Sequence, residues 1–226
     1  MTAPVHQHHH GAPVALTPGK ATPTWKLLVT LALAGGLSGW MVVTVYQLTL
    51  PAVERYAAAR ADAAVREVLE SPARWDTLYL HNGAIIAKAP AGVNPTELPA
   101  AYVGYDRSGT RVGVAVTAAE PGFQELLTLM IGFDPESGTL LGFKVLDQKE
   151  TPGLGDKIEL DSAFRNQFAR KTPPLTGVKG RPGGTRSEVQ TITGATISSR
   201  AVIRIINHAV AKWQPLLQAY ERGRTP

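Results

Sequence analysis

Two short segments of the chain have residue types and spacing that could bind a phosphate group and a flat ring. In the first, residues 191–199 carry five hydroxyl side chains immediately before a segment with helical periodicity. The free amides and positive dipole at the start of a helix attract phosphate, and Gly194 and Ala195 would let the backbone approach a bulky ligand. The same residues also fit plain helix capping by Thr196 or Ser198.

The second segment, residues 149–157, follows a predicted strand. Two glycines and a proline around Leu154 predict a rigid turn whose backbone could lie against a flat ring, with Glu150, Thr151 and Lys157 as flanking polar groups. A simple connection between two elements would have the same composition, so this segment does not identify a ligand by itself.

Together, the run Lys-Glu-Thr-Pro-Gly-Leu-Gly-Asp-Lys at 149–157 and the run Thr-Gly-Ala-Thr at 193–196 resemble the FMN-binding domain family. Within it, the order of anchor, sheet, turn, motif and final helix is similar to that of the G subunits of Rnf-type electron transport complexes. The resemblance implies that the hydroxyl of Thr196 is esterified to the phosphate of FMN. It also implies a cofactor site formed by the remaining motif residues Thr193, Gly194 and Ala195 and by the turn residues Glu150, Thr151, Pro152, Gly153 and Leu154.

By the same resemblance, the chain is an electron-relay subunit that passes electrons between partner subunits of a membrane complex coupled to ion translocation, and it is not catalytic alone. Its implied partners are the other subunits and a flavin transferase. In the family that the chain resembles, an acidic residue usually stands a few positions before the motif that corresponds to 193–196. This chain has Gln190 near that place. Two alternatives are the related C subunit of a sodium-translocating NADH:quinone reductase and a membrane-anchored sensory or assembly module that binds FMN without a covalent bond.

Composition and spacing exclude other kinds of site. The chain has no cysteine, which removes thiolate metal sites, cysteine-ligated clusters and disulfides. The net charge of +5 comes from scattered basic residues rather than a patch, so we expect no nucleic-acid binding. His81 and His208 are isolated, so we predict no metal site, and no catalytic residue is predicted. We expect four carboxylates in or beside turns to be solvated: Glu120, Glu125, Asp134 and Glu136.

An uncharged stretch at residues 27–50 is long enough to cross a membrane as a helix. Basic residues flank it on both sides, so the positive-inside rule does not choose an orientation. We expect a cytoplasmic, disordered tail at 1–24, a transmembrane helix at 25–50, a juxtamembrane helix at 51–72 and a periplasmic FMN-binding domain at 73–226. By resemblance, the membrane is a bacterial inner membrane that the chain spans once.

The remaining pattern predicts an α+β domain with a mainly antiparallel sheet flanked by helices. Short apolar runs are separated by turn pairs at residues 82–83, 108–109 and 137–138, as in a meandering sheet. Three- and four-residue apolar spacing predicts a final helix over 198–220, with a kink or break near Ala211 because Pro215 lies inside it. A short helix is expected over 161–171, and a loop over 172–186.

Overall fold

The computed structural model describes residues 23–223, so most of the predicted N-terminal tail lies outside the described part of the chain. The contacts divide the chain into two units, one ending at Glu54 and the other beginning at Arg55. The helix α1 (Thr24–Val68) belongs partly to each unit, and Pro51 does not interrupt it.

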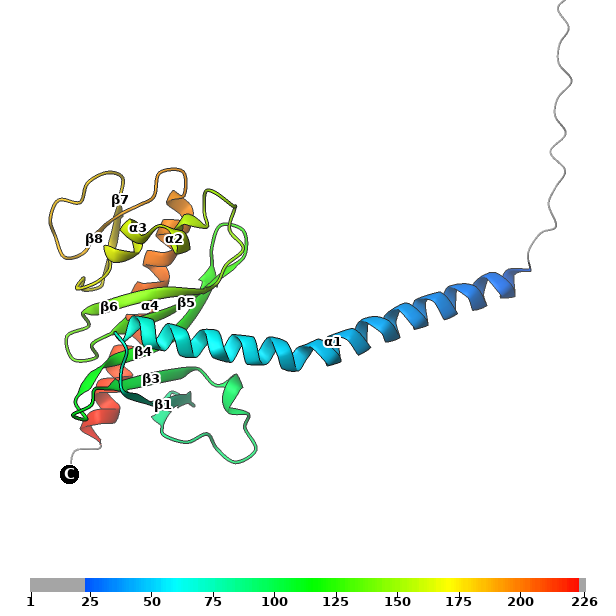
Figure 1. Ribbon diagram of the computed structural model, residues 1–226, viewed down its shortest axis with the longest axis horizontal. Helices are drawn as coiled ribbons and strands as arrows, with labels where there is room; N and C mark the ends of the chain where they lie inside the picture. Colours follow the sequence, from blue (N-terminus) through cyan, green and yellow to red (C-terminus); the bar gives the residue numbers. More distant parts are fainter. Residues whose placement is uncertain (1–22, 224–226) are drawn as a thin grey trace, which may run out of the picture. The chain divides into compact units, whose positions relative to one another are not determined.

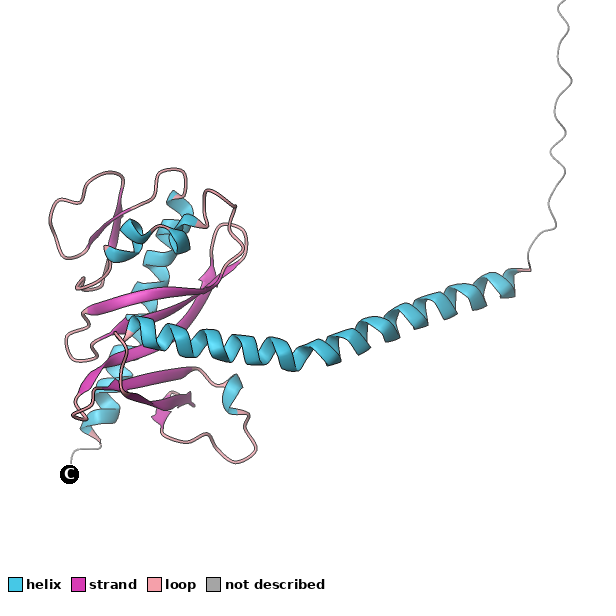
Figure 2. Cartoon of the chain, viewed as in Figure 1, coloured by secondary structure: helices cyan, strands magenta, loops and turns pink. Residues whose placement is uncertain are grey.

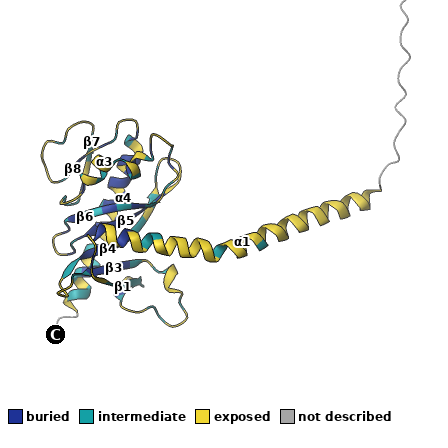
Figure 3. Cartoon of the chain, viewed as in Figure 1, coloured by how far each residue is buried: buried dark blue, intermediate teal, exposed yellow. Residues whose placement is uncertain are grey.

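In the first unit, α1 is a candidate membrane span. The window of highest mean hydropathy reaches 1.8, and none of it is buried against other parts of the protein. The hydroxyls of Thr30, Thr44 and Thr49 each donate to the carbonyl four residues earlier, at 2.8–3.0 Å. These bonds satisfy the polar groups inside the helix itself, as a hydrocarbon environment requires. Figure 3 shows this part of α1 as exposed along almost its whole length.

The second unit contains a six-stranded antiparallel sheet with the order β2-β1-β3-β4-β5-β6 (Figures 1 and 2). Its strands are β1 (Arg74–His81), β2 (Ala84–Ile86), β3 (Ala100–Tyr105), β4 (Arg111–Pro121), β5 (Leu126–Phe133) and β6 (Leu140–Asp147). A short 3₁₀ helix, η1 (Pro95–Glu97), lies between β2 and β3. The predicted antiparallel sheet is confirmed, and β3 to β6 follow one another as in a meander, whereas β3 pairs with β1 instead of β2.

The turn residues explain why two strands that a short turn joins pair with each other. Asn82 and Gly83 both have positive φ, 48° and 78°, as a type I′ hairpin turn requires. Gly109 and Gly138 also have positive φ in the β3–β4 and β5–β6 turns. Each turn is short, so the strands that it joins lie side by side in antiparallel order.

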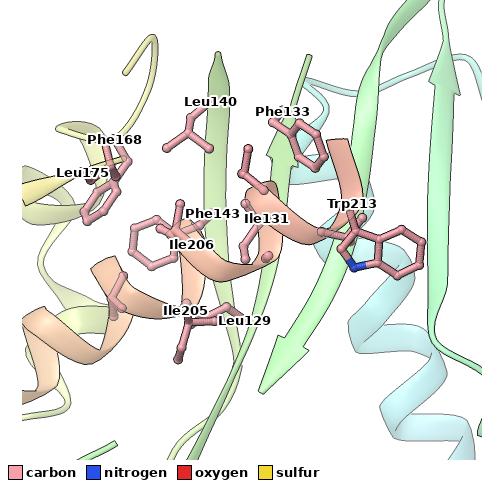
Figure 4. Packing of buried hydrophobic residues seen from close by; sticks show 14 of the residues in the cluster. Leu129, Ile131, Phe133, Leu140, Phe143, Phe168, Leu175, Ile205, Ile206 and Trp213 are labelled. Atoms are coloured by element: carbon pink, nitrogen blue, oxygen red, sulfur yellow. The ribbon is translucent and has the colours of Figure 1, made fainter. Parts of the chain in front are cut away.

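The final helix α4 (Thr196–Arg222) covers one face of the sheet and forms the main core with it (Figure 4). Alternate residues of β5 face this core, including Leu129, Ile131 and Phe133, because side chains alternate along a strand. From α4, Ile205, Ile206 and Trp213 pack into the same core.

The end of α1 covers the opposite face. Val65 and Val68 pack with Met130, which points away from the α4 side of β5. The approach is close at Gly132, where an added Cβ would lie 2.5 Å from the carbonyl oxygen of Val68. The sheet of the second unit is therefore flanked by helices on both faces.

The final helix is longer than predicted and runs without a break through Pro215 to Arg222. The predicted break near Ala211 is wrong, because α4 is continuous there, and a kink stays a prediction. Val210 and Trp213 before the proline and Leu217 after it are all buried in the core. Packing on both sides of Pro215 therefore offsets the loss of one backbone hydrogen bond.

The segment between β6 and α4 holds four short elements: α2 (Lys157–Leu160), α3 (Ser162–Asn166), β7 (Thr176–Val178) and β8 (Glu188–Gln190). Asp161 caps α3 through bonds from the amides of Ala163 and Phe164 at 2.8 and 3.2 Å. The helix ends earlier than predicted, and Arg170 already has a positive φ of 63°.

The predicted loop over 172–186 also contains β7, which pairs in parallel with β8. Residues that are not adjacent in the sequence form this pairing, so local composition did not reveal it.

Candidate functional site

The two unusual sequence segments meet in one pocket of about 370 Å³. From the turn after β6, Glu150, Thr151, Leu154 and Gly155 line it, and residues 194–198 line it from the start of α4. Among the predicted site residues, Thr193, Pro152 and Gly153 do not line the pocket. Thr193 lines a neighbouring pocket beside Gln190.

Thr196 is the first residue of α4 and is partly buried in the pocket wall. The capping interpretation of its hydroxyl is not supported, because Ala195 is the N-cap residue and no side chain caps the helix. Within residues 23–223, the Thr196 hydroxyl has no hydrogen-bond partner. The hydroxyl of this pocket-lining residue is therefore not committed to a bond within the described residues.

Most of the neighbouring hydroxyls hold the local structure together. Ser199 donates to the carbonyl of Ala195 at 2.8 Å and accepts from the amide of Ile192 at 3.0 Å. Thr191 donates to the carbonyl of Val178 at 3.2 Å, and Ser198 donates to a carboxylate. Thr193 resembles Thr196 in having no partner in the described part of the chain, but it is exposed outside the pocket.

The start of α4 also offers backbone donors. The first intrahelical bond runs from the amide of Ser199 to the carbonyl of Ala195. The amides of Thr196, Ile197 and Ser198 come before it and have no acceptor among the described residues, as expected for the first turn of a helix. The first turn contains no acidic residue. These amides and the helix dipole therefore form a site suited to an anion.

The turn at 149–157 lies directly beside this helix start. Gly153 has a φ of 75°, and the amides of Leu154 and Gly155 donate to the carbonyl of Thr151 at 3.1 and 2.9 Å. An added Cβ at Gly194, whose φ is 84°, would lie 3.4 Å from Cδ2 of Leu154. The two glycine-bearing segments thus face each other across the pocket, and Leu154 remains 47% exposed.

A third segment of the site was not predicted. The turn between β4 and β5 contributes Phe123 to the pocket, and its amide donates to Oε1 of Glu150 at 2.7 Å. In the same turn, Nε2 of Gln124 donates to the hydroxyl of Thr151 at 2.7 Å. Sequence reasoning also missed Ser198 as a partner of Glu150. No local sequence signal identifies these contacts, because they join segments distant in the chain.

Glu120, at the end of β4, is not the solvated turn residue that we expected. Its carboxylate pairs with Nε of Arg204 at 2.9 Å and with Nδ1 of His208 at 2.8 Å, both on α4. Burial acts to raise the pKa of Glu120, but the bonds and charges of His208 and Arg204 outweigh it and lower the pKa. Arg204 also donates to the carbonyl of Pro121. These contacts fix the β4–β5 turn against α4 near the pocket.

Groups of at least three histidine, aspartate or glutamate side chains that could hold a metal ion are absent from the described residues. His208 is not isolated as predicted, because its Nδ1 forms an ion pair with Glu120. The ring of His81 lies 3.1 Å from the side-chain amide of the adjacent Asn82. The pocket itself combines a free hydroxyl and helix amides with apolar side chains such as Phe123, Leu154 and Ile197.

The fold and the site together correspond to a known class of domain. Residues 122–211 match the family model described as the FMN-binding domain, and this range contains all three segments that line the pocket. Two solved structures share the fold. The NqrC protein of Shewanella oneidensis has a TM-score of 0.54 at 19% identity, covering 75% of this chain and 97% of that one. The C subunit of the Na(+)-translocating NADH-quinone reductase of Parabacteroides distasonis has a TM-score of 0.50 at 21% identity, covering 65% and 78%.

Sequence relatives define the family more narrowly. The chain is 32% identical to the G subunit of the ion-translocating oxidoreductase complex of Cronobacter sakazakii, covering 80% of this chain and 86% of the relative. It is 29% identical to the protein of the same name from Methanosarcina acetivorans, covering 82% and 92%. The G subunit of the Na(+)-translocating ferredoxin:NAD(+) oxidoreductase complex of Acetobacterium woodii is 27% identical, covering 88% and 98%. The chain belongs to the family formed by the G subunits of ion-translocating oxidoreductase complexes.

Proposed function

We propose that this chain is the electron-relay subunit of a membrane-bound Rnf-type complex and that it carries FMN as a phosphoester on Thr196. The observation that carries this proposal is the position of the Thr196 hydroxyl. It is free of hydrogen bonds within the described residues and belongs to the first residue of α4, which lines the pocket that the turn at 149–157 completes.

The residues present fit the two ends of FMN. The unpartnered amides of Thr196, Ile197 and Ser198 suit a phosphate, and the hydroxyl oxygen of Thr196 would become the bridging oxygen of the ester. Leu154, Ile197 and Phe123 supply apolar surface for a flat ring. Gly194 leaves room beside Leu154, because it has no side chain.

When bound, FMN supplies reversible electron uptake and release, which no side chain of this chain provides. A phosphoester leaves the ring itself unaltered, so the surrounding residues set its properties. We propose that other subunits supply and remove the electrons and that a flavin transferase forms the ester from an activated flavin nucleotide. The Thr196 oxygen bonds to the phosphorus of the FMN moiety and loses its proton, while the bond from that phosphorus to the departing nucleotide breaks. Names of the relatives, which are subunits of ion-translocating complexes, support this assignment.

Denaturing gel electrophoresis distinguishes covalent attachment of FMN from reversible binding. A covalently attached flavin stays with the polypeptide during denaturing gel electrophoresis and fluoresces under ultraviolet light, whereas a reversibly bound one is lost. We expect a fluorescent band when the chain is coexpressed with a flavin transferase and no such band without the transferase. A dark band after coexpression would rule out covalent attachment. The C-subunit alternative shares the fold, but the sequence relatives favour the G-subunit assignment.

We also propose a topology in which the N-terminus lies in the cytoplasm and the FMN-binding domain lies in the periplasm. The candidate span in α1 supports one membrane crossing. A phosphatase that is active only in the periplasm, fused after Pro226, should be active in a bacterial host. A cytoplasmic reporter fused at the same position should be inactive, and the opposite pattern would reverse the topology.

Leu154 provides a test of the pocket that is separate from attachment. We expect Leu154→Ala to change the absorbance spectrum of the bound flavin while the fluorescent gel band stays, because the side chain lines the pocket and the acceptor hydroxyl is untouched. Its partial exposure limits the loss of folding stability to about 1 kcal/mol.

Leu160→Ala is the matched control, since Leu160 lies on the nearby α2, is exposed and does not line the pocket. Its flavin spectrum should equal that of the wild type. Identical spectra for both variants would show that Leu154 is not a neighbour of the ring.

A further inference from the structure

Glu150 is the one charged residue that is buried within the described range 23–223, with only 6% of its surface exposed. It lies in the wall of the pocket, and no lysine, arginine or histidine in that range forms an ion pair with it. Burying a carboxylate without a cation is costly unless hydrogen-bond donors satisfy it. Its position therefore requires an explanation other than a simple ion pair.

The carboxylate joins the three segments that form the pocket. Its Oε1 accepts from the amide of Phe123 at 2.7 Å, and its Oε2 accepts from the hydroxyl of Ser198 at 2.7 Å. The amide of Glu150 itself donates to Oε1 of Gln148 at 2.8 Å, which fixes the backbone of the turn. One side chain thus links the β4–β5 turn, the turn at 149–157 and the first turn of α4.

Two glycines make room for this carboxylate. A Cβ added at Gly155 would lie 2.7 Å from both Cβ and Oε2 of Glu150 and 3.0 Å from Oγ of Ser198. A Cβ added at Gly122 would collide with Oε1 on the other side. A larger residue at either position would displace the carboxylate from its hydrogen-bond donors. The two glycines therefore leave the space that the Glu150 side chain occupies.

Ser198 connects this arrangement to the proposed attachment residue. It lies two residues after Thr196 in the first turn of α4, is 3% exposed and uses its hydroxyl for Glu150. The start of α4 has no side-chain cap, so the bond between Ser198 and Glu150 is a side-chain restraint that the turn at 149–157 places on it. The positive end of the helix dipole also favours a carboxylate at this place.

We propose that Glu150 and Ser198 are positioning residues, which lock the first turn of α4 against the turn at 149–157 and so hold a flavin on Thr196 in a single orientation within the pocket. This inference rests on the proposed function, since it requires a flavin on Thr196. Neither residue is the attachment point. Their effect is on the geometry of the bound ring.

The test uses the full chain, coexpressed with a flavin transferase and purified in detergent. Circular dichroism in the visible absorption bands of flavin reports how asymmetrically the ring is held, and fluorescence anisotropy reports its mobility. We expect Ser198→Ala to keep a fluorescent gel band, to lose most of the visible dichroism and to lower the anisotropy. Loss of the hydroxyl leaves Oε2 of Glu150 without its donor and frees the helix start.

Glu150→Gln is the conservative variant. A glutamine can accept from the amide of Phe123 through its oxygen and donate to Oγ of Ser198 through its nitrogen, so both links remain. We therefore expect it to keep the dichroism that Ser198→Ala loses. A loss of dichroism in Glu150→Gln as large as that in Ser198→Ala would show that the two links do not suffice to hold the ring, and would overturn the proposal.

Thr191→Val is the matched control, because Thr191 is also a buried hydroxyl, 5% exposed, but it bonds the carbonyl of Val178 outside the pocket. Its dichroism should equal that of the wild type. Should Ser198→Ala fail to fold, Gly155→Ala tests the same link from the opposite side, since the added Cβ would press on both Glu150 and Ser198. It should likewise lower the dichroism.

The outcomes separate this inference from the proposed function. A wild-type chain without a fluorescent band would refute covalent attachment itself. A fluorescent wild type, with unchanged dichroism in Ser198→Ala and Gly155→Ala, would overturn only the positioning role of Glu150 and Ser198.

Discussion

Thr196→Val is expected to abolish the fluorescent flavin band completely. Valine has nearly the shape of threonine and the same branched Cβ, but it has no hydroxyl that could form an ester. Thr196 makes no side-chain cap at the start of α4, so the free energy of unfolding should change by no more than about 1 kcal/mol. Gel fluorescence after coexpression with the transferase, set against the amount of stained protein, measures the effect.

Thr193→Val serves as the comparison, because Thr193 belongs to the same sequence motif but lies outside the pocket. It should retain at least part of the band. A band that persists in Thr196→Val and disappears in Thr193→Val would place the ester on Thr193 instead.

Trp213→Ala should have the largest effect on stability, lowering the free energy of unfolding by about 3–5 kcal/mol. The indole is 2% exposed and belongs to the core between α4 and the sheet, where Figure 4 shows it on the helix facing the strands. Its loss would leave a cavity between α4 and the sheet, close to Pro215, where packing keeps the helix continuous. Denaturant titration of the detergent-solubilised chain, followed by circular dichroism, gives the change.

Lys212→Ala is the control for this measurement, since Lys212 is the adjacent exposed residue of the same helix. It should shift the free energy by no more than about 0.5 kcal/mol. Similar denaturant midpoints of unfolding for the two variants would show that the core around Trp213 contributes little to the stability of the domain.

The parts of the fold that the sequence predicts are those governed by local rules. Asn82-Gly83 favours a tight hairpin, and the apolar spacing from Val202 to Leu217 defines one buried helix face. Where tertiary packing competes with a local rule, the local rule fails. Pro215 alone predicts an interruption of α4, but burial of Trp213 and Leu217 on either side keeps the helix continuous.

In the candidate site too, features set by local sequence could be predicted, whereas contacts between distant segments could not. The turn at 149–157 and the motif at 193–196 could be recognised separately from their residue types, and only a family resemblance placed them together. Phe123 and the bond between Ser198 and Glu150 could not be predicted, since that bond joins residues 48 positions apart. The composition of residues 149–157 predicts a turn, but it does not predict which distant groups donate hydrogen bonds to the buried carboxylate of Glu150.

The most direct test of covalent attachment is the mass of the tryptic peptide that contains Thr196. Cleavage after Arg186 and Arg200 yields residues 187–200, which include every hydroxyl of the motif region. We predict that this peptide is heavier by the mass of FMN less one water, and that its fragment ions place the addition on Thr196. An unmodified peptide after coexpression with a flavin transferase, or an addition on Thr193, Ser198 or another residue, would contradict the assignment of Thr196 as the flavin acceptor.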